Sequence, residues 1–372
     1  MLRLQGEMIR GGTSKCWIFD HHDVVATGVD VDTLLLGAFN AADPRQIDGV
    51  GGASSTTSKA AVVQASAEPG VDIEYAFAQV GIGDERVEWA SNCGNCATAV
   101  ALYAVHRGLV PIAADTTTVR MLNVNTGARL TGAIPTPGGS APDEGTAAVP
   151  GTSALGVPVL LGFQDPAGST TGRALPTGYV VDTLTGPEGP VEVSLVDAGA
   201  PAALVEAKAF GLDGAESLAE FAAAVPALTR LRRGAALAMG LAEKNDPVSH
   251  AVPKVGIVSR PIPYRTTDGV LVAQDEYDLA VRMVSMHAPH PAIGLTSAVA
   301  LATAVAIPGT LAHRVARETP DGTLRLGTPA GVITAQTVPA PEGVSPTVLL
   351  RRAARRIARA ELLVPVPEGR PA

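Results

Sequence analysis

The chain contains few aromatic and few charged residues. Of its 372 residues, 3% are aromatic and 17% are charged, whereas 46% are hydrophobic. A chain so rich in apolar residues has enough material for sizeable cores, which argues against large-scale disorder. The chain is longer than a domain with one small core, and its length suits two domains of ordinary size.

Cysteine is scarce, and negative charge exceeds positive charge. Three cysteines, Cys16, Cys93 and Cys96, are an odd and small number for a disulfide framework, which predicts a reducing compartment. The net charge of −8 argues against nucleic acid or an anionic membrane as a partner, because either would be repelled at long range. No apolar run approaches the roughly 20 residues that span a bilayer, and no charged-then-apolar signal pattern opens the chain. We therefore expect a cytoplasmic protein that binds any small anionic ligand in a local cationic pocket.

The stretch Ser91-Asn92-Cys93-Gly94-Asn95-Cys96 leads directly into an Ala-rich apolar run over residues 97–105. A polar turn before such a run is typical of a helix N-terminus, where free N–H groups and the positive end of the dipole collect. A thiol at that position is expected to ionise more easily than a free thiol, and a carboxylate can bind at the same end. This stretch therefore offers both an acid/base group and a carboxylate cradle.

Cys-x-x-Cys also occurs in zinc and redox sites. The chain has no second cysteine pair to complete a zinc site, and Gly94-Asn95 is not a redox-type intervening pair, so we expect no metal. Cys96 is interpreted as a small buried hydrophobic residue.

The segment Arg-Gly-Gly-Thr-Ser-Lys at 10–15 separates two strand-like runs, 2–8 and 16–19. Its two glycines allow the backbone to approach a ligand closely, and Arg10 and Lys15 could hold a carboxylate. The alternative is a hairpin turn with solvated charges, and these residues alone favour that alternative.

A glycine and hydroxyl tract over residues 49–58 ends at Lys59. The spacing of a phosphate-binding P-loop is absent. A lysine at the edge of a buried strand is a usable base once burial disfavours its charged form. The alternative is an ordinary surface lysine, which the residues alone favour.

Strand and helix patterns recur along the chain. Strands are predicted over 73–80, 191–196, 203–207, 254–258 and 277–286. A helical region over 217–242 is predicted to begin at a Ser217 cap and to break near Pro226, and a helix over 296–306 is predicted to be capped by Thr296 or Ser297. The Pro- and Gly-rich region 134–178 is expected to be loops and a crossing between domains. The arginine-rich segment 347–364 is interpreted as a strand and turn with solvated arginines rather than a nucleic-acid-binding helix.

Six motifs in one order resemble the 2-methylaconitate cis-trans isomerase family, which also includes 4-oxalomesaconate tautomerases and methylitaconate isomerases. The match runs from residue 1 to about residue 365. The motifs are Arg-Gly-Gly-Thr-Ser-Lys at 10–15, the 51–59 tract that ends Thr57-Ser58-Lys59, Ser-Asn-Cys-Gly-Asn at 91–95, the 166–178 segment, Asp-Ala-Gly-Ala-Pro at 197–201 and Ile-Pro-Gly-Thr at 307–310.

The resemblance implies the diaminopimelate-epimerase-like fold, which is α+β. It implies two similar domains, each a barrel-like sheet around a central helix, with the site in the cleft between them. We place the domains at 1–180 and 181–372, with the last strand free to return to the first domain. Family members rearrange unsaturated di- or tricarboxylates by proton transfer without a cofactor. A homodimer is compatible with the resemblance.

The resemblance also assigns site residues. It places the catalytic lysine at Lys59 and the motif cysteine at Cys93. It suggests substrate contacts from Arg10, Ser14, Lys15, Ser54, Ser55, Ser58, Gly94, Asn95, His287 and Thr296. Cys16 stands where many members have glycine. Gly-Leu-Thr-Ser-Ala at 294–298 stands where true epimerases of this fold carry a second thiol, so a two-thiol racemase mechanism is not expected.

The predicted function is a cofactor-independent isomerase or tautomerase. In this hypothesis Lys59 removes an allylic proton, and N–H groups at 93–95 stabilise the delocalised anion. Whether Cys93 returns the proton or only lines the pocket stays open. Two alternatives are a Cys93/His287 nucleophilic hydrolase and a non-catalytic carboxylate-binding protein.

Overall fold

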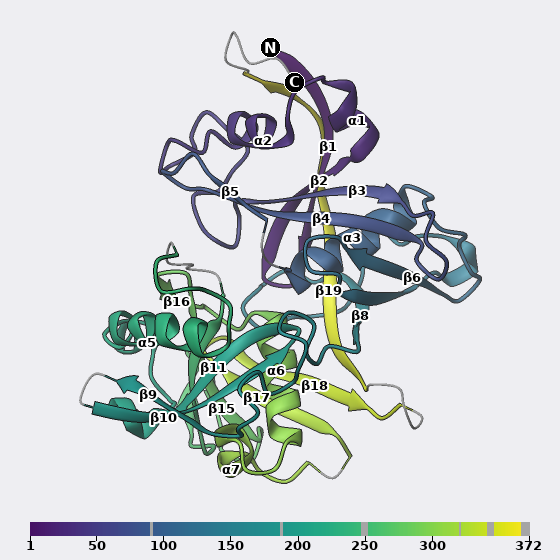
Figure 1. Ribbon diagram of the computed structural model, residues 1–372. Helices are drawn as coiled ribbons and strands as arrows, with labels where there is room; N and C mark the ends of the chain where they lie inside the picture. The colour runs from purple at the N-terminus through teal and green to yellow at the C-terminus, as the bar shows by residue number, and fades with distance from the viewer. Residues whose placement is uncertain (90–91, 187–188, 247–251, 320, 341–345, 366–372) are drawn as a thin grey trace. The chain divides into compact units, whose positions relative to one another are not determined.

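A computed structural model describes the chain except for residues 90–91, 187–188, 247–251, 320, 341–345 and 366–372 (Figure 1). Strands and helices are both abundant, so the predicted α+β class is confirmed. The chain divides into two compact units: unit 1 is Met1–Gly162 with Arg351–Ala372, and unit 2 is Phe163–Leu350. The domain boundary that the sequence placed at residue 180 stays a prediction.

Unit 1 is built on a mixed sheet around one helix. The strands pair in the order β8, β19, β1, β2, β3, β4, β6, β7, and β5 pairs with β4. Their bounds are β1 (Leu2–Gly11), β2 (Ser14–Asp20), β3 (Lys59–Ala65), β4 (Ile73–Val80), β5 (Val87–Glu88), β6 (Thr116–Asn123), β7 (Arg129–Pro135), β8 (Val157–Gln164) and β19 (Thr347–Val364).

The central helix of unit 1 is α3 (Gly94–His106), which packs against β1, β2, β3, β6 and β7. Every residue of α3 from Gly94 to Val105 is buried. Small side chains make this possible, because an Ala-rich helix lets the surrounding strands approach its backbone closely. The two shorter helices of the unit are α1 (His21–Ala26) and α2 (Val31–Phe39), and η1 (Pro137–Gly139) is a single 3₁₀ turn.

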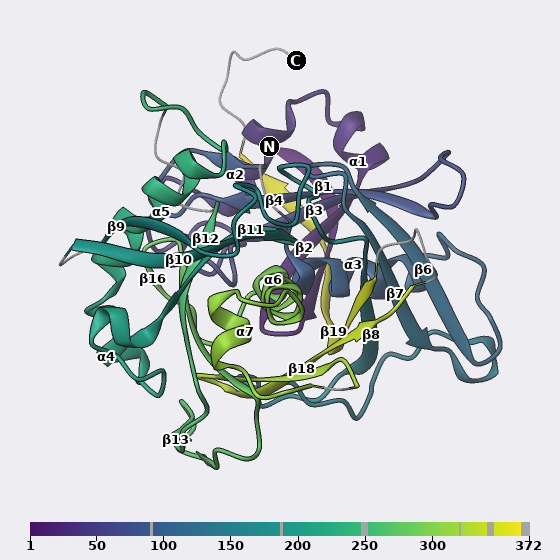
Figure 2. The ribbon, with the colours of Figure 1, turned by 60° about the horizontal axis from the view of Figure 1, so that its bottom comes forward.

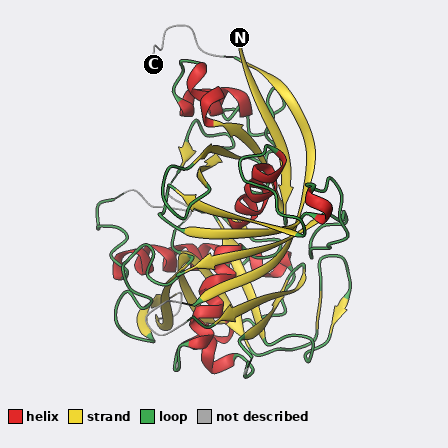
Figure 3. Cartoon of the chain, turned by 90° about the vertical axis from the view of Figure 1, so that its right-hand side faces the viewer, coloured by secondary structure: helices red, strands yellow, loops and turns green. Residues whose placement is uncertain are grey.

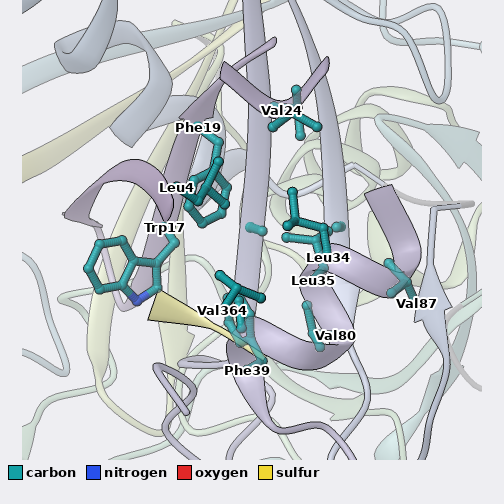
Figure 4. Packing of buried hydrophobic residues seen from close by; sticks show 14 of the residues in the cluster. Leu4, Trp17, Phe19, Val24, Leu34, Leu35, Phe39, Val80, Val87 and Val364 are labelled. Carbon is teal, nitrogen blue, oxygen red and sulfur yellow. The ribbon is translucent and has the colours of Figure 1, made fainter. Parts of the chain in front are cut away.

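A hydrophobic core lies on the side of the sheet that carries α1 and α2. Figure 4 shows Leu34, Leu35 and Phe39 of α2 facing Leu4, Phe19 and Val364, which come from β1, β2 and β19. The strand β1 pairs along its whole length with residues 354–364 of β19 (Figure 3). The last strand of the chain is therefore part of the frame of unit 1 rather than an appendage.

Unit 2 has the same sequence of pairings. In unit 1 the pairs β1–β2, β2–β3, β3–β4, β4–β6 and β6–β7 alternate between antiparallel and parallel. In unit 2 the pairs β10–β11, β11–β12, β12–β15, β15–β17 and β17–β18 alternate in the same way. The bounds are β9 (Asp182–Gly186), β10 (Gly189–Ala198), β11 (Ala200–Glu206), β12 (Lys254–Ser259), β13 (Tyr264–Arg265), β14 (Leu271–Val272), β15 (Leu279–Ser285), β16 (Ala288–Pro289), β17 (Thr323–Thr328) and β18 (Gly331–Val338).

The central helix of unit 2 is α6 (Leu295–Ala306), which packs against β10, β11 and β18. Figure 2 looks almost along its axis, with these strands around it. The other helices are η2 (Ala207–Phe210), α4 (Leu218–Ala222), α5 (Val225–Ala238) and α7 (Leu311–Val315). The described residues form no helix long and apolar enough to cross a membrane.

Several local predictions are confirmed. The strand over 73–80 is β4, and the arginine-rich segment 347–364 is β19. Ser217 caps α4 in a capping box with Glu220, and Pro226 opens α5.

Other local predictions are wrong. The region 134–178 is not all loop, because it contains β8. The N-cap of α6 is Gly294, not Thr296 or Ser297, which lie buried in its first turn.

Candidate functional site

Cys93 is the N-cap residue of α3, as the sequence pattern predicts, with φ −125° and ψ 103°. Its side chain makes no capping hydrogen bond, so the first turn of the helix keeps its capacity to bind an anion. Asn92, the residue before it, is buried and accepts a hydrogen bond from the Tyr75 hydroxyl at Oδ1 over 2.9 Å. Its Nδ2 has no partner among the described residues. Ser91 of the same motif lies outside the described residues.

The three cysteines of the chain lie together at this end of α3. A hydrogen bond with Cys96, and then burial, raise the pKa of Cys93 well above its usual value, while the nearby charge of Lys59 acts in the opposite direction. Burial, followed by a hydrogen bond with Cys16, likewise raises the pKa of Cys96. The expectation that Cys93 ionises more easily than a free thiol is therefore wrong, because the hydrogen bond with Cys96, and then burial, outweigh the helix dipole.

The protonation of Cys93 bears on its chemistry. A thiol with a raised pKa holds its proton at neutral pH and can donate it to an anion. A nucleophilic hydrolase requires the opposite, a thiolate that is ready to attack. Cys96 is 1% exposed, so its interpretation as a small buried residue is confirmed.

Lys59 begins β3 and is 8% exposed, so the alternative of a surface lysine is wrong. Its Nζ donates a hydrogen bond to Gln79 Oε1 over 2.6 Å and lies 4.9 Å from the ring centroid of Phe77. Gln79 is the register partner of Lys59 across the β3–β4 pair, and its Nε2 donates to the carbonyl of Ser58 over 2.9 Å. This second bond determines which end of the amide meets the lysine. The amine is thus oriented by a neutral acceptor.

The hydroxyl tract before Lys59 forms a compact turn. The carbonyl of Ser54 accepts from the backbone N–H groups of Thr57 and Ser58, each over 3.0 Å. The Ser58 hydroxyl is buried and donates to Gln46 Oε1 over 2.5 Å, and the Ser54 and Thr57 hydroxyls lie 2.7 Å apart. Ser55 is half-buried in the same turn. The turn therefore sets the position from which β3 and Lys59 begin.

The segment 10–15 is a tight hairpin, as the alternative weighed from the sequence predicts, but the Arg10 charge is not solvated as that alternative expects, because its side chain is half-buried. Arg10 pairs with Lys15 in the β1–β2 register, and Gly12 takes a φ of +58° at the turn. The Arg10 guanidinium donates to the carbonyls of Gly12, Ala154 and Leu155 over 3.0–3.2 Å. Backbone carbonyls thus hold the Arg10 side chain in place, and its charge contributes to the local potential.

Asn95 joins the hairpin to the helix. It lies in the first turn of α3 and is buried, and its Nδ2 donates to the hydroxyls of Thr13 and Ser14 over 3.1 and 3.3 Å. Its Oδ1 accepts from Arg352 Nη2 over 3.1 Å. Predicted site residues from two distant segments therefore meet at one place in unit 1.

Arg352 is the residue that sequence reasoning missed. The charge pattern of this segment predicts solvated arginines, but Arg352 is 4% exposed, whereas Arg351 and Arg355 on the same strand are exposed. The difference follows from strand alternation, since neighbouring side chains point to opposite faces. The available signal was the apolar run Ala353-Ala354 beside it, which marks the inward-facing part of β19.

His287 and Thr296 belong to unit 2, whereas Lys59 and Cys93 belong to unit 1. His287 is exposed after β15, and Thr296 is buried in the first turn of α6. The motif over 166–178 has a structural explanation. Asp197 Oδ2 accepts from the backbone N–H groups of Thr170 and Thr171 and from the Thr171 hydroxyl, over 2.6–2.9 Å.

Metal ligands do not gather in the part of the chain that the structure describes. No group of three or more His, Cys, Asp or Glu side chains is placed there to hold a metal ion.

Comparison with known proteins gives a family match over almost the entire chain. A family described as "PrpF protein" matches residues 1–365. The chain is 37% identical to a (4E)-oxalomesaconate Delta-isomerase of Novosphingobium sp. over 87% of each chain. It is 32% identical to a 2-methyl-aconitate isomerase of Shewanella oneidensis over 98% of each.

A solved structure agrees with these relatives. The crystal structure of a methylitaconate-delta-isomerase superposes with a TM-score of 0.81 at 32% identity, covering 98% of this chain and 96% of that one. The relatives are isomerases of unsaturated carboxylates, so the predicted family, enzyme class and type of reaction are confirmed at the level of the family.

Proposed function

Because the chain belongs to the PrpF protein family, we propose that it is a cofactor-independent isomerase that moves a proton and a double bond within an unsaturated di- or tricarboxylate. One observation carries the roles that we assign. The buried amine of Lys59 acts electrostatically on the protonated thiol of Cys93 at the open N-terminus of α3. A base and an acid of different chemistry thus belong to two elements, β3 and α3, that pack against each other.

The first step is removal of a proton from the carbon next to the double bond. Lys59, in the deprotonated form that a base requires, takes the proton at Nζ, while Gln79 keeps the nitrogen in place. The electron pair of the broken C–H bond spreads over the former double bond to a carboxylate or oxo oxygen. A positioned base of this kind contributes about 10²–10⁴-fold to the rate.

The anion formed in this step requires nearby positive potential. N–H groups of Gly94 and Asn95 at the start of α3 supply it, as fixed dipoles that need no reorganisation during the reaction. Arg10 and Lys15 of the hairpin add formal charge.

The second step returns a proton at the other allylic carbon. Cys93 donates it from Sγ, which its raised pKa suits, and becomes a thiolate. The proton on Lys59 then passes to that thiolate, directly or through one water, which restores both groups. Rotation within the anion before the second step exchanges cis and trans isomers.

The proposal includes the organisation of the chain. Units 1 and 2 act as two similar diaminopimelate-epimerase-like domains, each with a central helix, and their equal order of strand pairing supports this. Within unit 2, His287 and Thr296 are assigned to carboxylate binding. Within unit 1, Ser14, Ser54, Ser55 and Ser58 are assigned to the lining of the substrate pocket.

The test is a panel of unsaturated di- and tricarboxylates, including 2-methylaconitate, oxalomesaconate and methylitaconate, followed by ultraviolet absorbance and proton NMR. We expect turnover of at least one, with deuterium from solvent entering the allylic carbons. Lys59→Ala should reduce kcat by about 10²-fold or more while leaving the fold intact, because the base is lost. The exposed Lys244 provides a matched control, and Lys244→Ala should retain full activity.

Three outcomes would contradict the assignment. A substantially active Lys59→Ala variant would remove the lysine from its role as base. Burst labelling of Cys93 by a substrate-derived acyl group would indicate the hydrolase instead. Binding of carboxylates without any proton exchange would indicate a non-catalytic binding protein.

A further inference from the structure

Arg352 is a buried cation without an acidic partner. Buried arginines are ordinarily paired with carboxylates, because an unpaired charge in the interior is costly. Among the described residues, no Asp or Glu forms an ion pair with Arg352, and Asn95 Oδ1 is the one hydrogen-bond acceptor that its guanidinium meets. Its Nε is buried and donates to no group. One edge of this guanidinium therefore lacks an acceptor.

The position of Arg352 is held on several sides. Asn95 offers its amide oxygen to Arg352 because its amide nitrogen is committed to the hydroxyls of Thr13 and Ser14. Gly12 leaves the necessary space, since a Cβ at that residue would lie 2.4 Å from Arg352 Nη2. A buried side chain held by two segments, with donors left over, is a built binding site rather than a stray surface charge.

The local charges also favour an anion. Burial, and then the positive charge of Arg10, lower the pKa of Arg352 to about 10, so its guanidinium is still charged at neutral pH. Arg10 and Arg352 are thus two cations close enough to repel each other. Cys93 interacts electrostatically with Arg352 as well, which places this charge beside the proposed acid. The missing partner is a negatively charged group that enters with the ligand.

We propose that Arg352 is a specificity-determining residue that binds one carboxylate of the substrate through its unoccupied edge. This inference rests on the proposed function. In it, the Arg352 guanidinium is the group that selects a di- or tricarboxylate over a substrate with one carboxylate fewer. A planar guanidinium and a carboxylate match as a pair of parallel hydrogen bonds, which a lysine cannot reproduce. Asn95 is the positioning residue for Arg352.

The experiment compares a turned-over substrate with its monomethyl esters, each carboxylate being esterified in turn. For the wild-type protein, one ester should lose about 100-fold or more in kcat/KM, because a buried charge pair is broken. In Arg352→Met, which keeps the length and removes the charge, the acid and that ester should react at similar rates. Arg351→Met is the matched control, an exposed arginine on the same strand, and should preserve the wild-type ratio.

Thermal unfolding gives a second readout that a merely structural role would not produce. Removing an unpaired buried charge should leave the Tm of Arg352→Met equal to or above that of the wild type. Addition of the dicarboxylate should raise the Tm of the wild type and of Arg351→Met, but not that of Arg352→Met. If Arg352→Met does not fold, Arg352→Lys replaces it, with partial loss of the acid-to-ester ratio expected.

The failures of the two proposals are distinguishable. If the wild type turns over the panel and Arg352→Met keeps the full acid-to-ester ratio, the role of Arg352 is refuted while the isomerase stands. If the wild type turns over nothing, the proposed function fails, and the Tm shift decides whether Arg352 binds carboxylates. Equal Tm shifts in the wild type and in Arg352→Met, or none in either, would overturn the inference.

Discussion

At the scale of single residues, the candidate site contains three side chains, and each has a different environment that suits it to a different role. Lys59 is oriented by a neutral amide, Cys93 is kept protonated by Cys96 and by burial, and Arg352 keeps its charge without an acidic partner. Enzymes commonly assign acid and base roles through such differences of environment. The role of such a side chain can therefore be tested by substituting a neighbouring residue rather than the side chain itself.

The raised pKa of Cys93 predicts its reactivity. A free thiol ionises around pH 8.5, so alkylation by iodoacetamide approaches a plateau above that pH. For Cys93 the rate should still be climbing there, because the thiolate forms only at higher pH. Lys59→Met removes the charge that lowers the pKa, so alkylation at any one pH should slow further. Peptide fragmentation in a mass spectrometer separates Cys93 from Cys96, and a plateau for Cys93 at or below pH 8.5 would contradict the account.

At the scale of elements, the hairpin β1–β2 and the helix α3 form one assembly. The turn at Gly12 touches both Asn95 of the helix and Arg352 of β19. This contact depends on a residue without a side chain, in a backbone conformation that favours glycine. The geometry of the site thus depends on the packing of the β1–β2 hairpin, α3 and β19 against one another.

Gly12→Ala should be strongly destabilising and should abolish turnover. The added Cβ would lie 2.2 Å from Asn95 Oδ1, so the Asn95–Arg352 hydrogen bond must break in addition to the strain of a positive φ. Gly28 provides the control, with a φ of +67° and nothing within 4 Å of an added Cβ. Gly28→Ala should cost only the backbone strain, on the order of 1–3 kcal/mol. Chemical denaturation measures both, and equal losses for the two variants would show that the close approach has no effect.

At the scale of the whole molecule, unit 2 is one continuous segment, whereas unit 1 combines residues from both ends of the chain. Residues 354–364 of β19 complete the pairing of β1 and carry the C-terminal part of the unit 1 core. Unit 2 has a core of its own, formed between α5 and the strands β10 to β12.

This division predicts how fragments fold. Residues 163–350 should fold alone, whereas residues 1–162 should not, because β1 would lose β19. Joining residues 351–365 through a short linker to Met1 should restore unit 1, since Val364 lies opposite Leu2 in the register. Circular dichroism and thermal unfolding measure the outcome. A cooperative transition of the 1–162 fragment at the same temperature as the rearranged chain would contradict the prediction.

The sequence by itself determined the family, the α+β class and many elements. Local signals sufficed for the start of α3 at the Cys93 turn, for the Ser217 cap and for the strands β4 and β19, because capping and alternation depend on near neighbours. Motif order alone pointed to Lys59 and Cys93. These features depend only on which residue types lie close together in the sequence.

The tertiary structure decided which side chains are buried and what they meet. Local residues favour a surface lysine for Lys59, an easily ionised thiol for Cys93 and a solvated arginine for Arg352. Burial reverses the first and third interpretations, and the hydrogen bond with Cys96, followed by burial, reverses the second. Burial and desolvation arise from segments far apart in the chain, such as Arg352 against Asn95. No local pattern encodes such contacts, because the free energy of a charge depends on everything packed around it.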